Sequence, residues 1–287
     1  MYGPSLPRLS THLDSRVDVE GGKVKRTTKL HLAVQDGNVA AVREALKDGV
    51  DVDALNDKGS TALHLSAKAP HIDIEIMRLL LLHGADFKLM DKAIIWPATP
   101  ICLAAETGNL EGTRLLLEVG ADAPELEGER TAALNSATSE GHLHIVRLLL
   151  EHKTPIGFDA GYRSTMHTAA ASTDKNALDI MHLLIEYGGD IKQLDDYERS
   201  PLQLAAMHGA NEIIQVLLDL RADSREPNVI AAAVASRSCE AVHLLLKHSA
   251  NANAIDHQGM SMLQIAVYGI DRSVYELCNF YLKMGQT

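Results

Sequence analysis

The side chains best suited to chemistry in this sequence are its fourteen histidines. Zinc is usually held by three or four His, Cys, Asp or Glu side chains that converge on one point. His142 and His144 are two residues apart, and His208 and His257 could meet only if distant segments fold together. The sequence places no carboxylate or thiolate with either pair. We therefore predict no metal site and no cofactor.

Covalent catalysis would need an activated serine or cysteine. The three cysteines, Cys102, Cys239 and Cys278, lie far apart in apolar stretches and form no CxxC pair. The sequence also lacks a GxSxG segment and a glycine-rich phosphate loop. These patterns favour reduced, buried thiols and a protein that is not an enzyme.

Repeated units must position these side chains, because similar segments recur along the sequence at a regular interval. Ser200–Asp223 reads SPLQLAAMHGANEIIQVLLDLRAD and aligns without a gap to Thr99–Asp122, TPICLAAETGNLEGTRLLLEVGAD. The aliphatic residue after the Thr/Ser-Pro position recurs every 28 to 38 residues, at Leu30, Leu63, Ile101, Leu134, Met166, Leu202, Ile230 and Leu263. A period of this length indicates a stack of eight small units.

The repeated pattern resembles that of the ankyrin-repeat family, T-P-L-H-x-A-A-x-x-G-H followed by L-L-x-x-G-A-D. Units 1, 2, 3 and 6 match it best, whereas units 4, 5, 7 and 8 have diverged. The resemblance covers about nine-tenths of the chain. It implies an all-α solenoid of antiparallel helix pairs with β-hairpin-like fingers, and a function in protein–protein interaction.

Each unit is expected to form two short helices. A Thr or Ser should cap the first helix, and the histidine at the fourth position (His31, His64 and His167) should link neighbouring turns by hydrogen bonds. Paired alanines such as Ala104–Ala105 let helices approach closely. Because a pair of helices of about 33 residues cannot bury its apolar faces alone, stacking must complete the core.

A stack of this kind has a concave face made of hairpin tips and the exposed residues of the first helices. The repeat register places two kinds of residue on this face: carboxylates, and residue types that are enriched in interfaces. We expect the C-terminal half to be the principal contact surface, although each position could also be an ordinary solvated residue. The predicted partner-binding residues are Trp96, Glu106, Glu140, Arg163, Tyr197, Arg199, Met207, His208, His257, Met260 and Tyr268.

Trp96 stands in a connection, DKAIIWPATP, that is about five residues longer than the basic period. Extra length in repeat arrays usually forms loops on one face, often the binding face. The connection either presents Ile94, Ile95 and Trp96 as an apolar anchor or folds back over a neighbouring hairpin.

Two alternative functions use the same groove. A closed pocket near Trp96, Tyr197 and Tyr268 would bind a small ligand. Acid–base groups assembled from distant units, with Glu106 or Glu140 opposite Arg199 or His208, would make an unusual enzyme. The small-ligand alternative predicts a deep apolar cavity, whereas a protein-binding scaffold predicts a wide, shallow groove of mixed charge.

The bulk composition limits the partner classes. The net charge is −11, so phosphate backbones are repelled and nucleic acid is a poor partner. The longest apolar stretch, Val229–Ala235, is far too short to span a bilayer, and the N-terminus has no apolar run of signal-peptide length. We expect a monomer that is soluble and intracellular, in cytoplasm or nucleus, with a protein or peptide as its partner.

The predicted organisation is an N-terminal extension, residues 1–22, followed by one repeat domain, residues 23–287. The extension forms either a short strand at Arg16–Glu20 or no regular structure. The eight repeats are expected at about 23–55, 56–90, 91–125, 126–158, 159–194, 195–224, 225–254 and 255–287.

Overall fold

The fold is known from a computed structural model. The structure describes residues 19–20, 23–24, 27–71, 73–92, 97–121, 123–159, 164–226, 228–251, 253–255, 258–262 and 264–265.

Seven helix pairs follow one another along the described residues. They are α1 (Lys29–Gln35) and α2 (Val39–Lys47), α3 (Ala62–Ala67) and α4 (Ile74–Leu82), α5 (Pro100–Glu106) and α6 (Leu110–Leu116), α7 (Glu127–Ser139) and α8 (Leu143–Glu151), α9 (Thr165–Ala171) and α10 (Ala177–Glu186), α11 (Pro201–His208) and α12 (Asn211–Asp219), and α13 (Val229–Ala235) and α14 (Cys239–Lys247). Most of the eighth predicted unit lies outside the described residues.

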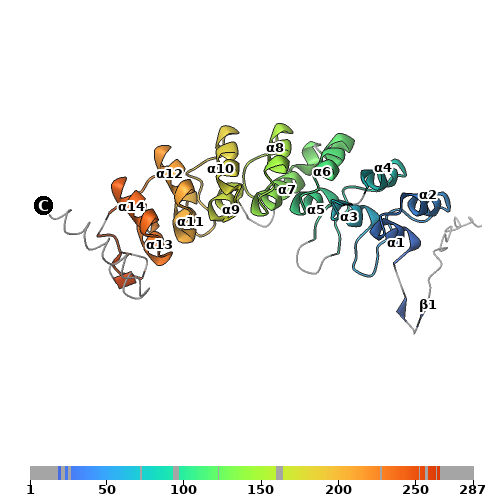
Figure 1. Ribbon diagram of the computed structural model, residues 1–287, viewed down its shortest axis with the longest axis horizontal. Helices are drawn as coiled ribbons and strands as arrows, with labels where there is room; N and C mark the ends of the chain where they lie inside the picture. The colour runs from blue at the N-terminus through green and yellow to red at the C-terminus, as the bar shows by residue number, and fades with distance from the viewer. Residues whose placement is uncertain are drawn as a thin grey trace, which may run out of the picture.

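The helices form two layers. Each first helix packs against the first helix of the next repeat, from α1 on α3 to α11 on α13, and the second helices do the same from α2 to α14. Figure 1 shows the stack as a curved arc, with the first helices on its inner side and the connecting loops projecting from them. The predicted all-α solenoid is confirmed.

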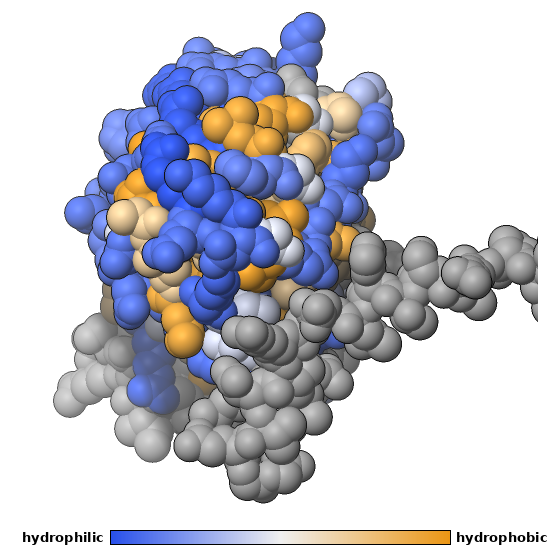
Figure 2. All heavy atoms as spheres, turned by 90° about the vertical axis from the view of Figure 1, so that its right-hand side faces the viewer, coloured by the Kyte–Doolittle hydropathy of each residue, from blue (hydrophilic) through white to orange (hydrophobic). Residues whose placement is uncertain are grey.

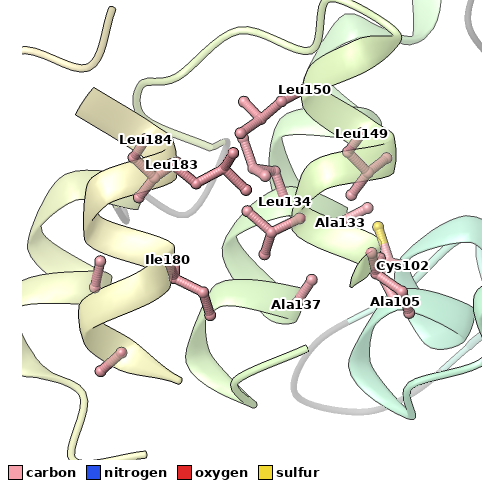
Figure 3. Close-up of a cluster of buried hydrophobic side chains, with 14 of the residues drawn as sticks. Cys102, Ala105, Ala133, Leu134, Ala137, Leu149, Leu150, Ile180, Leu183 and Leu184 are labelled. Carbon is pink, nitrogen blue, oxygen red and sulfur yellow. The ribbon is translucent and has the colours of Figure 1, made fainter. Parts of the chain in front are cut away.

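The core runs as a continuous seam between the layers. The repeat anchors from Leu30 to Ile230 are at most 3% exposed, and the paired alanines such as Ala104–Ala105 are fully buried. Figure 3 shows the seam at the centre of the stack, where Leu134 and Ala137 of α7 meet Leu149 and Leu150 of α8 and Ile180 of α10. Aliphatic side chains thus fill a thin core that a chain with 4% aromatic residues can pack.

Five of the described first helices, α1, α3, α5, α9 and α11, follow the predicted hydroxyl residues, but only some of the hydroxyls act as caps. Thr61 and Ser200 each accept a hydrogen bond from the backbone N–H three residues on, at 3.3 Å and 3.2 Å. Thr99 and Ser164 accept no such hydrogen bond; their hydroxyls donate to Cys102 Sγ and to Gln193 Oε1. The expectation of a uniform cap was therefore wrong for Thr99 and Ser164.

The hairpin expected between repeats 3 and 4 is absent. After a 3₁₀ turn, η2 (Pro124–Leu126), the chain enters α7 directly, so Glu129 lies in the first turn of a helix and not on a hairpin. Glu127 stands at the position where Asn56, Asp91 and Asp195 form the turns of other connections. The carboxylates of Glu127 and Glu129 stabilise a helix N-terminus instead.

A short β-ribbon crosses the predicted boundary between the extension and the repeat domain, because β1 (Val19–Glu20) pairs antiparallel with β2 (Lys23–Val24). Figure 2 looks onto the end of the stack formed by the first repeat and shows apolar side chains among polar ones. Leu32 of α1 is 52% exposed, whereas Leu103 and Leu204, at the same position of later repeats, are 7% exposed. The difference follows from stacking, because among the described residues no helix pair lies before α1 to cover Leu32.

Candidate partner-binding surface

Loops called fingers join successive repeats, and each is named by the repeats that it joins. Finger 1/2 spans residues 51–60, finger 2/3 residues 86–98, finger 4/5 residues 155–164, finger 5/6 residues 190–199 and finger 7/8 residues 251–260. Finger 5/6 is a tight turn, closed by a backbone hydrogen bond of 3.0 Å from Asp195 N–H to Arg199 O. Finger 1/2 is closed in the same way between Asn56 and Ser60, at 3.0 Å.

Buried histidines fasten the fingers to the first helices. Nε2 of His31 donates to Ser60 O at 3.2 Å, Nε2 of His64 to Ala98 O at 3.1 Å, and Nε2 of His167 to Arg199 O at 2.7 Å. Each bond runs from one first helix to the finger that follows it. The predicted linking role of these histidines is confirmed.

Burial disfavours the charged form of these imidazoles. Desolvation lowers the pKa of His31, His64 and His167, although hydrogen bonds to backbone carbonyls partly oppose it. In the neutral form, Nδ1 of His31 and His64 accepts a hydrogen bond from the backbone N–H of Thr28 and Thr61, at 3.2 Å and 3.3 Å. Protonation would remove that acceptor.

Cys102 occupies the histidine position in the third repeat. Its thiol is buried, lies 3.4 Å from Glu129 O and accepts from the Thr99 hydroxyl at 3.4 Å. The thiol therefore links α5 to α7 as the imidazoles link other repeats. A structural role for Cys102, as predicted, is what its contacts support.

Finger 5/6 is organised around the carboxylate of Asp195. Its Oδ1 accepts from the backbone N–H groups of Tyr197 and Arg199, both at 2.9 Å, and its Oδ2 accepts from Arg199 Nε at 2.8 Å and Nη2 at 2.7 Å. Partial burial alone would raise the pKa of Asp195, but the hydrogen bonds from Arg199 and Tyr197 outweigh it and hold the pKa below its usual value. The turn therefore carries an ionised carboxylate at its centre.

This turn displays an aromatic ring. Tyr197 is 78% exposed, and the guanidinium carbon of Arg199 lies 4.7 Å from its ring centroid. Tyr197 and Arg199 are the two predicted contact residues that the structure brings together.

The other described candidates form a separate row. Glu106, Glu140, Met207 and His208 lie at the C-terminal ends of first helices, and all four are exposed. Tyr197 and Arg199 come before the N-terminus of α11, whereas His208 is the last residue of that helix. At a rise of 1.5 Å per residue, the two ends of α11 are about 10 Å apart along its axis. The surface therefore has two edges, the fingers and the helix ends, and these residues do not converge on one point.

Four predicted residues, Trp96, Arg163, His257 and Tyr268, lie outside the described residues. Met260 is half-buried in finger 7/8, after Gly259. Its position corresponds to that of Arg199 in finger 5/6.

Sequence reasoning missed an apolar position in the fingers. Met90, Phe158, Leu194 and Ile255 each precede the aspartate of their finger, and they are 54%, 37%, 53% and 62% exposed. The signal in the sequence is the recurring pair of a large apolar residue and an aspartate. Exposed apolar residues at one register position form a row along the fingers, and such surfaces mark interaction sites.

Two cavities of the described part lie elsewhere. One, of about 440 Å³, is lined by second-helix residues of repeats 2 and 3, and the other, of about 560 Å³, lies beside Leu150 and Tyr187. Neither is lined by Glu106, Tyr197, Arg199 or His208. Across the described ranges, no group of three or more His, Cys, Asp or Glu side chains is placed to hold a metal ion. Among the described helices, none has the length and apolar character that a membrane crossing requires.

Comparison with known proteins agrees with this architecture. The family model for ankyrin repeats (3 copies) matches residues 8–91, 69–161 and 152–228. The chain is 31% identical over 229 residues to ankyrin repeat protein nuc-2 of Neurospora crassa, a match that covers 79% of this chain and 21% of nuc-2. It is 28% identical over 192 residues to putative ankyrin repeat protein YahD of Escherichia coli, covering 65% of this chain and 92% of YahD.

Two human proteins extend the comparison. Ankyrin repeat and SOCS box protein 16 is 28% identical over 213 residues, and the match spans 72% of this chain but only 46% of that protein. The crystal structure of the ASB11 ankyrin repeat domain superposes with a TM-score of 0.55 at 20% identity and covers 88% of this chain and 97% of that domain. The structural likeness concerns the fold alone.

Ankyrin repeats generally mediate protein–protein interaction, and the family is generally non-catalytic. The repeated pattern, the two-layered stack of helix pairs and the match of the family model to residues 8–228 agree with one another. The chain belongs to the ankyrin-repeat family.

Proposed function

We propose that the chain is a non-catalytic scaffold that binds a partner protein or peptide along its fingers and the adjoining faces of its first helices. The observation that carries this proposal is the row of exposed apolar side chains Met90, Phe158, Leu194 and Ile255. Each of them would lose water-exposed apolar surface when a partner covers the fingers, and that loss drives association.

Finger 5/6 is the strongest part of this surface. Tyr197 offers a large exposed ring with a polar end, a combination that is enriched at the energetic centres of interfaces. The four hydrogen bonds to Asp195 fix the turn before any partner arrives. A preorganised loop loses little conformational entropy on binding, so more of the contact energy is expressed as affinity.

The position of the row supports a bias toward the C-terminal half. Phe158, Leu194 and Ile255 all follow α7, the helix that replaces the finger between repeats 3 and 4. Only Met90 precedes it. A partner that contacts neighbouring fingers would therefore meet most of the apolar surface beyond α7, where Arg163, His257 and Tyr268 are also predicted to contribute.

A pair of matched double variants tests the proposal. Leu194→Ser with Tyr197→Ser removes two exposed apolar side chains from finger 5/6. Leu220→Ser with Tyr187→Ser removes the same two residue types from the ends of second helices, where they are 45% and 42% exposed. All three proteins are used as bait in a cell lysate, and captured proteins are quantified by mass spectrometry.

We expect proteins that bind the wild type and the Leu220/Tyr187 variant to be lost from the Leu194/Tyr197 variant. For a purified partner, the dissociation constant should rise at least about tenfold. Equal capture by both variants would contradict a finger-based surface. Thermal unfolding at the wild-type temperature establishes that neither variant has lost its fold.

A further inference from the structure

A second apolar surface lies on the opposite side of the stack. It is a groove between the C-terminal ends of α4 and α6, lined by Arg78, Leu82, Ala85, Phe87, Leu115 and Val119 among others, with a volume of about 440 Å³. We call it the outer groove. Most of its lining residues belong to α4 and α6, which lie in the outer layer of the stack (Figure 1), or to the turns that end these helices, and Phe87, near the start of finger 2/3, completes the lining.

The outer groove exposes apolar side chains that folding has not covered. Leu82 is 81% exposed, the largest exposed fraction among the large apolar residues of the described part, and Val119 is 40% exposed. Phe87 and Leu115 form the floor between them. Exposed aliphatic side chains around a concave apolar floor are typical of a site that receives a side chain from another molecule.

The rim beside α6 is a turn at the end of that helix. After Leu116 the chain passes through η1 (Leu117–Ala121), where Gly120 has a non-helical φ of 114°, and Val119 of this turn lines the groove. α4 ends in a similar way, because Gly84 stands at the position of Gly120 and has a φ of 85°. A Cβ on Gly120 would lie 3.7 Å from Phe87 Cζ, an ordinary van der Waals distance, so the positive φ and not the Phe87 ring favours glycine here.

Arg78 is the one charged residue that lines the outer groove. Arg43, at the same position of the first repeat, is paired with Glu75 at 2.6 Å. Glu75, three residues before Arg78, is therefore paired with Arg43. Arg78 itself forms no ion pair with any residue in the described ranges. An unpaired guanidinium beside an apolar floor is complementary to a carboxylate that accompanies an apolar side chain.

We propose that the outer groove binds a short segment of a partner protein in which a bulky aliphatic or aromatic side chain lies within a few residues of Asp or Glu. The apolar side chain would lie over Phe87 and Leu115, between Leu82 and Val119. The carboxylate would pair with Arg78. The rim of the groove is open, because Leu82 is highly exposed. Such a rim fits a single side chain whose backbone stays outside the groove. It does not fit a long alkyl chain, which would need to be enclosed.

Selection of peptides from a random 16-residue phage library against the full-length chain tests this proposal. Selected peptides are then synthesised, and their dissociation constants are measured by fluorescence polarisation. The test variants are Arg78→Glu and Leu82→Lys. The matched controls are Arg147→Glu, at the position of Arg78 in α8, and Leu220→Lys, an exposed leucine beyond α12.

We expect a class of peptides that combines a bulky apolar residue with a nearby Asp or Glu. Their affinity should fall at least about tenfold in Arg78→Glu and in Leu82→Lys, and should stay unchanged in both controls and in Tyr197→Ala. The Tyr197 variant changes finger 5/6 but not the outer groove. The proposal for the groove and the proposal for the fingers are therefore tested independently.

Three results would overturn the proposal. One is that no such class of peptides emerges. Another is that its members bind Arg78→Glu and Leu82→Lys as tightly as the wild type. The third is that dodecanoate, tested as the lipid alternative, binds with dependence on Arg78 and Leu82 while no peptide does. Leu82 and Arg78 are exposed, so circular dichroism of both variants should match the wild type.

Discussion

At the scale of single residues, the same position joins four of the repeats to the repeat that follows. His31, His64 and His167 fill it with imidazoles that donate to a finger carbonyl, and Cys102 fills it with a thiol. The residue types are visible in the sequence, and their linking role follows from the repeat register. The particular carbonyl that each of them meets depends on the offset between stacked repeats, which only the coordinates give.

The histidine links predict a pH dependence of stability. Burial lowers the pKa of all three imidazoles, so the unfolded chain binds more protons than the folded chain below about pH 6.5. The stability that depends on neutral imidazoles is complete above the unfolded pKa and is lost as the pH falls toward the lower folded values. Urea unfolding at about pH 7.5 and about pH 5.5 should therefore show a lower midpoint at the acid pH.

A triple variant, His31→Gln, His64→Gln and His167→Gln, provides the control. Gln203 already occupies this position in the sixth repeat, so the amide is compatible with the fold. The variant should lose less stability between the two pH values than the wild type loses. An identical loss in both proteins would show that other groups cause the acid sensitivity.

The exposed apolar row shows where residue-level reasoning from sequence stops. Met90, Phe158, Leu194 and Ile255 are the types that normally enter a core, so nothing local marks them as exposed. In finger 5/6, Leu194 directly precedes Asp195, whose carboxylate accepts hydrogen bonds from the backbone N–H groups of Tyr197 and Arg199 and so fixes the turn. Tyr197 and Arg199 were predicted as neighbours on the same hairpin, and the structure adds the Asp195 carboxylate that organises them.

At the scale of elements, helix lengths and packing follow closely from the pattern, whereas the connections do not. The replacement of a finger by α7 depends on a small difference, in which an acidic, helix-favouring segment stands where other repeats have a turn-forming Asn or Asp. The turn before α13 is similarly short, and the left-handed Asn228 closes it in place of a hairpin. The spacing of 28 residues before Ile230, the shortest in the chain, agrees with this shortening.

Neighbouring fingers also support one another, and Gly59 is where they touch. Lys92 N–H donates to Gly59 O at 2.9 Å, and a Cβ on Gly59 would lie 2.5 Å from Lys92 Cβ. Gly49 has a similar positive φ, 73° against 79°, but no atom near its missing Cβ. Gly49→Ala should cost about 1 kcal/mol for the backbone conformation alone, and Gly59→Ala about 2 kcal/mol or more because the contact adds to it.

Chemical denaturation of both glycine variants measures this difference. Amide exchange at Lys92 should accelerate in Gly59→Ala and stay at the wild-type rate in Gly49→Ala. Equal losses of unfolding free energy would mean that the fingers do not depend on each other.

At the scale of the whole molecule, stability comes from contacts between adjacent repeats. Leu103 is 7% exposed because a preceding repeat covers it, and Leu32 is 52% exposed because it stands at the end of the stack. Leu103→Ala should therefore cost about 2 to 5 kcal/mol, as for other buried leucines. Leu32→Ala should cost less than about 1 kcal/mol. Urea titration of the two variants makes the comparison, and similar losses would refute the end-of-stack explanation.

Native-state hydrogen exchange of the full chain tests the stacking claim most directly. A central first helix such as α7 is covered by repeats on both sides, whereas α1 has a neighbour on one side only. The free energy of opening should therefore be highest for buried amides of α7 and α9 and should decrease toward α1. Amides of α1 that exchange as slowly as those of α7 would contradict a stack held together by its nearest neighbours.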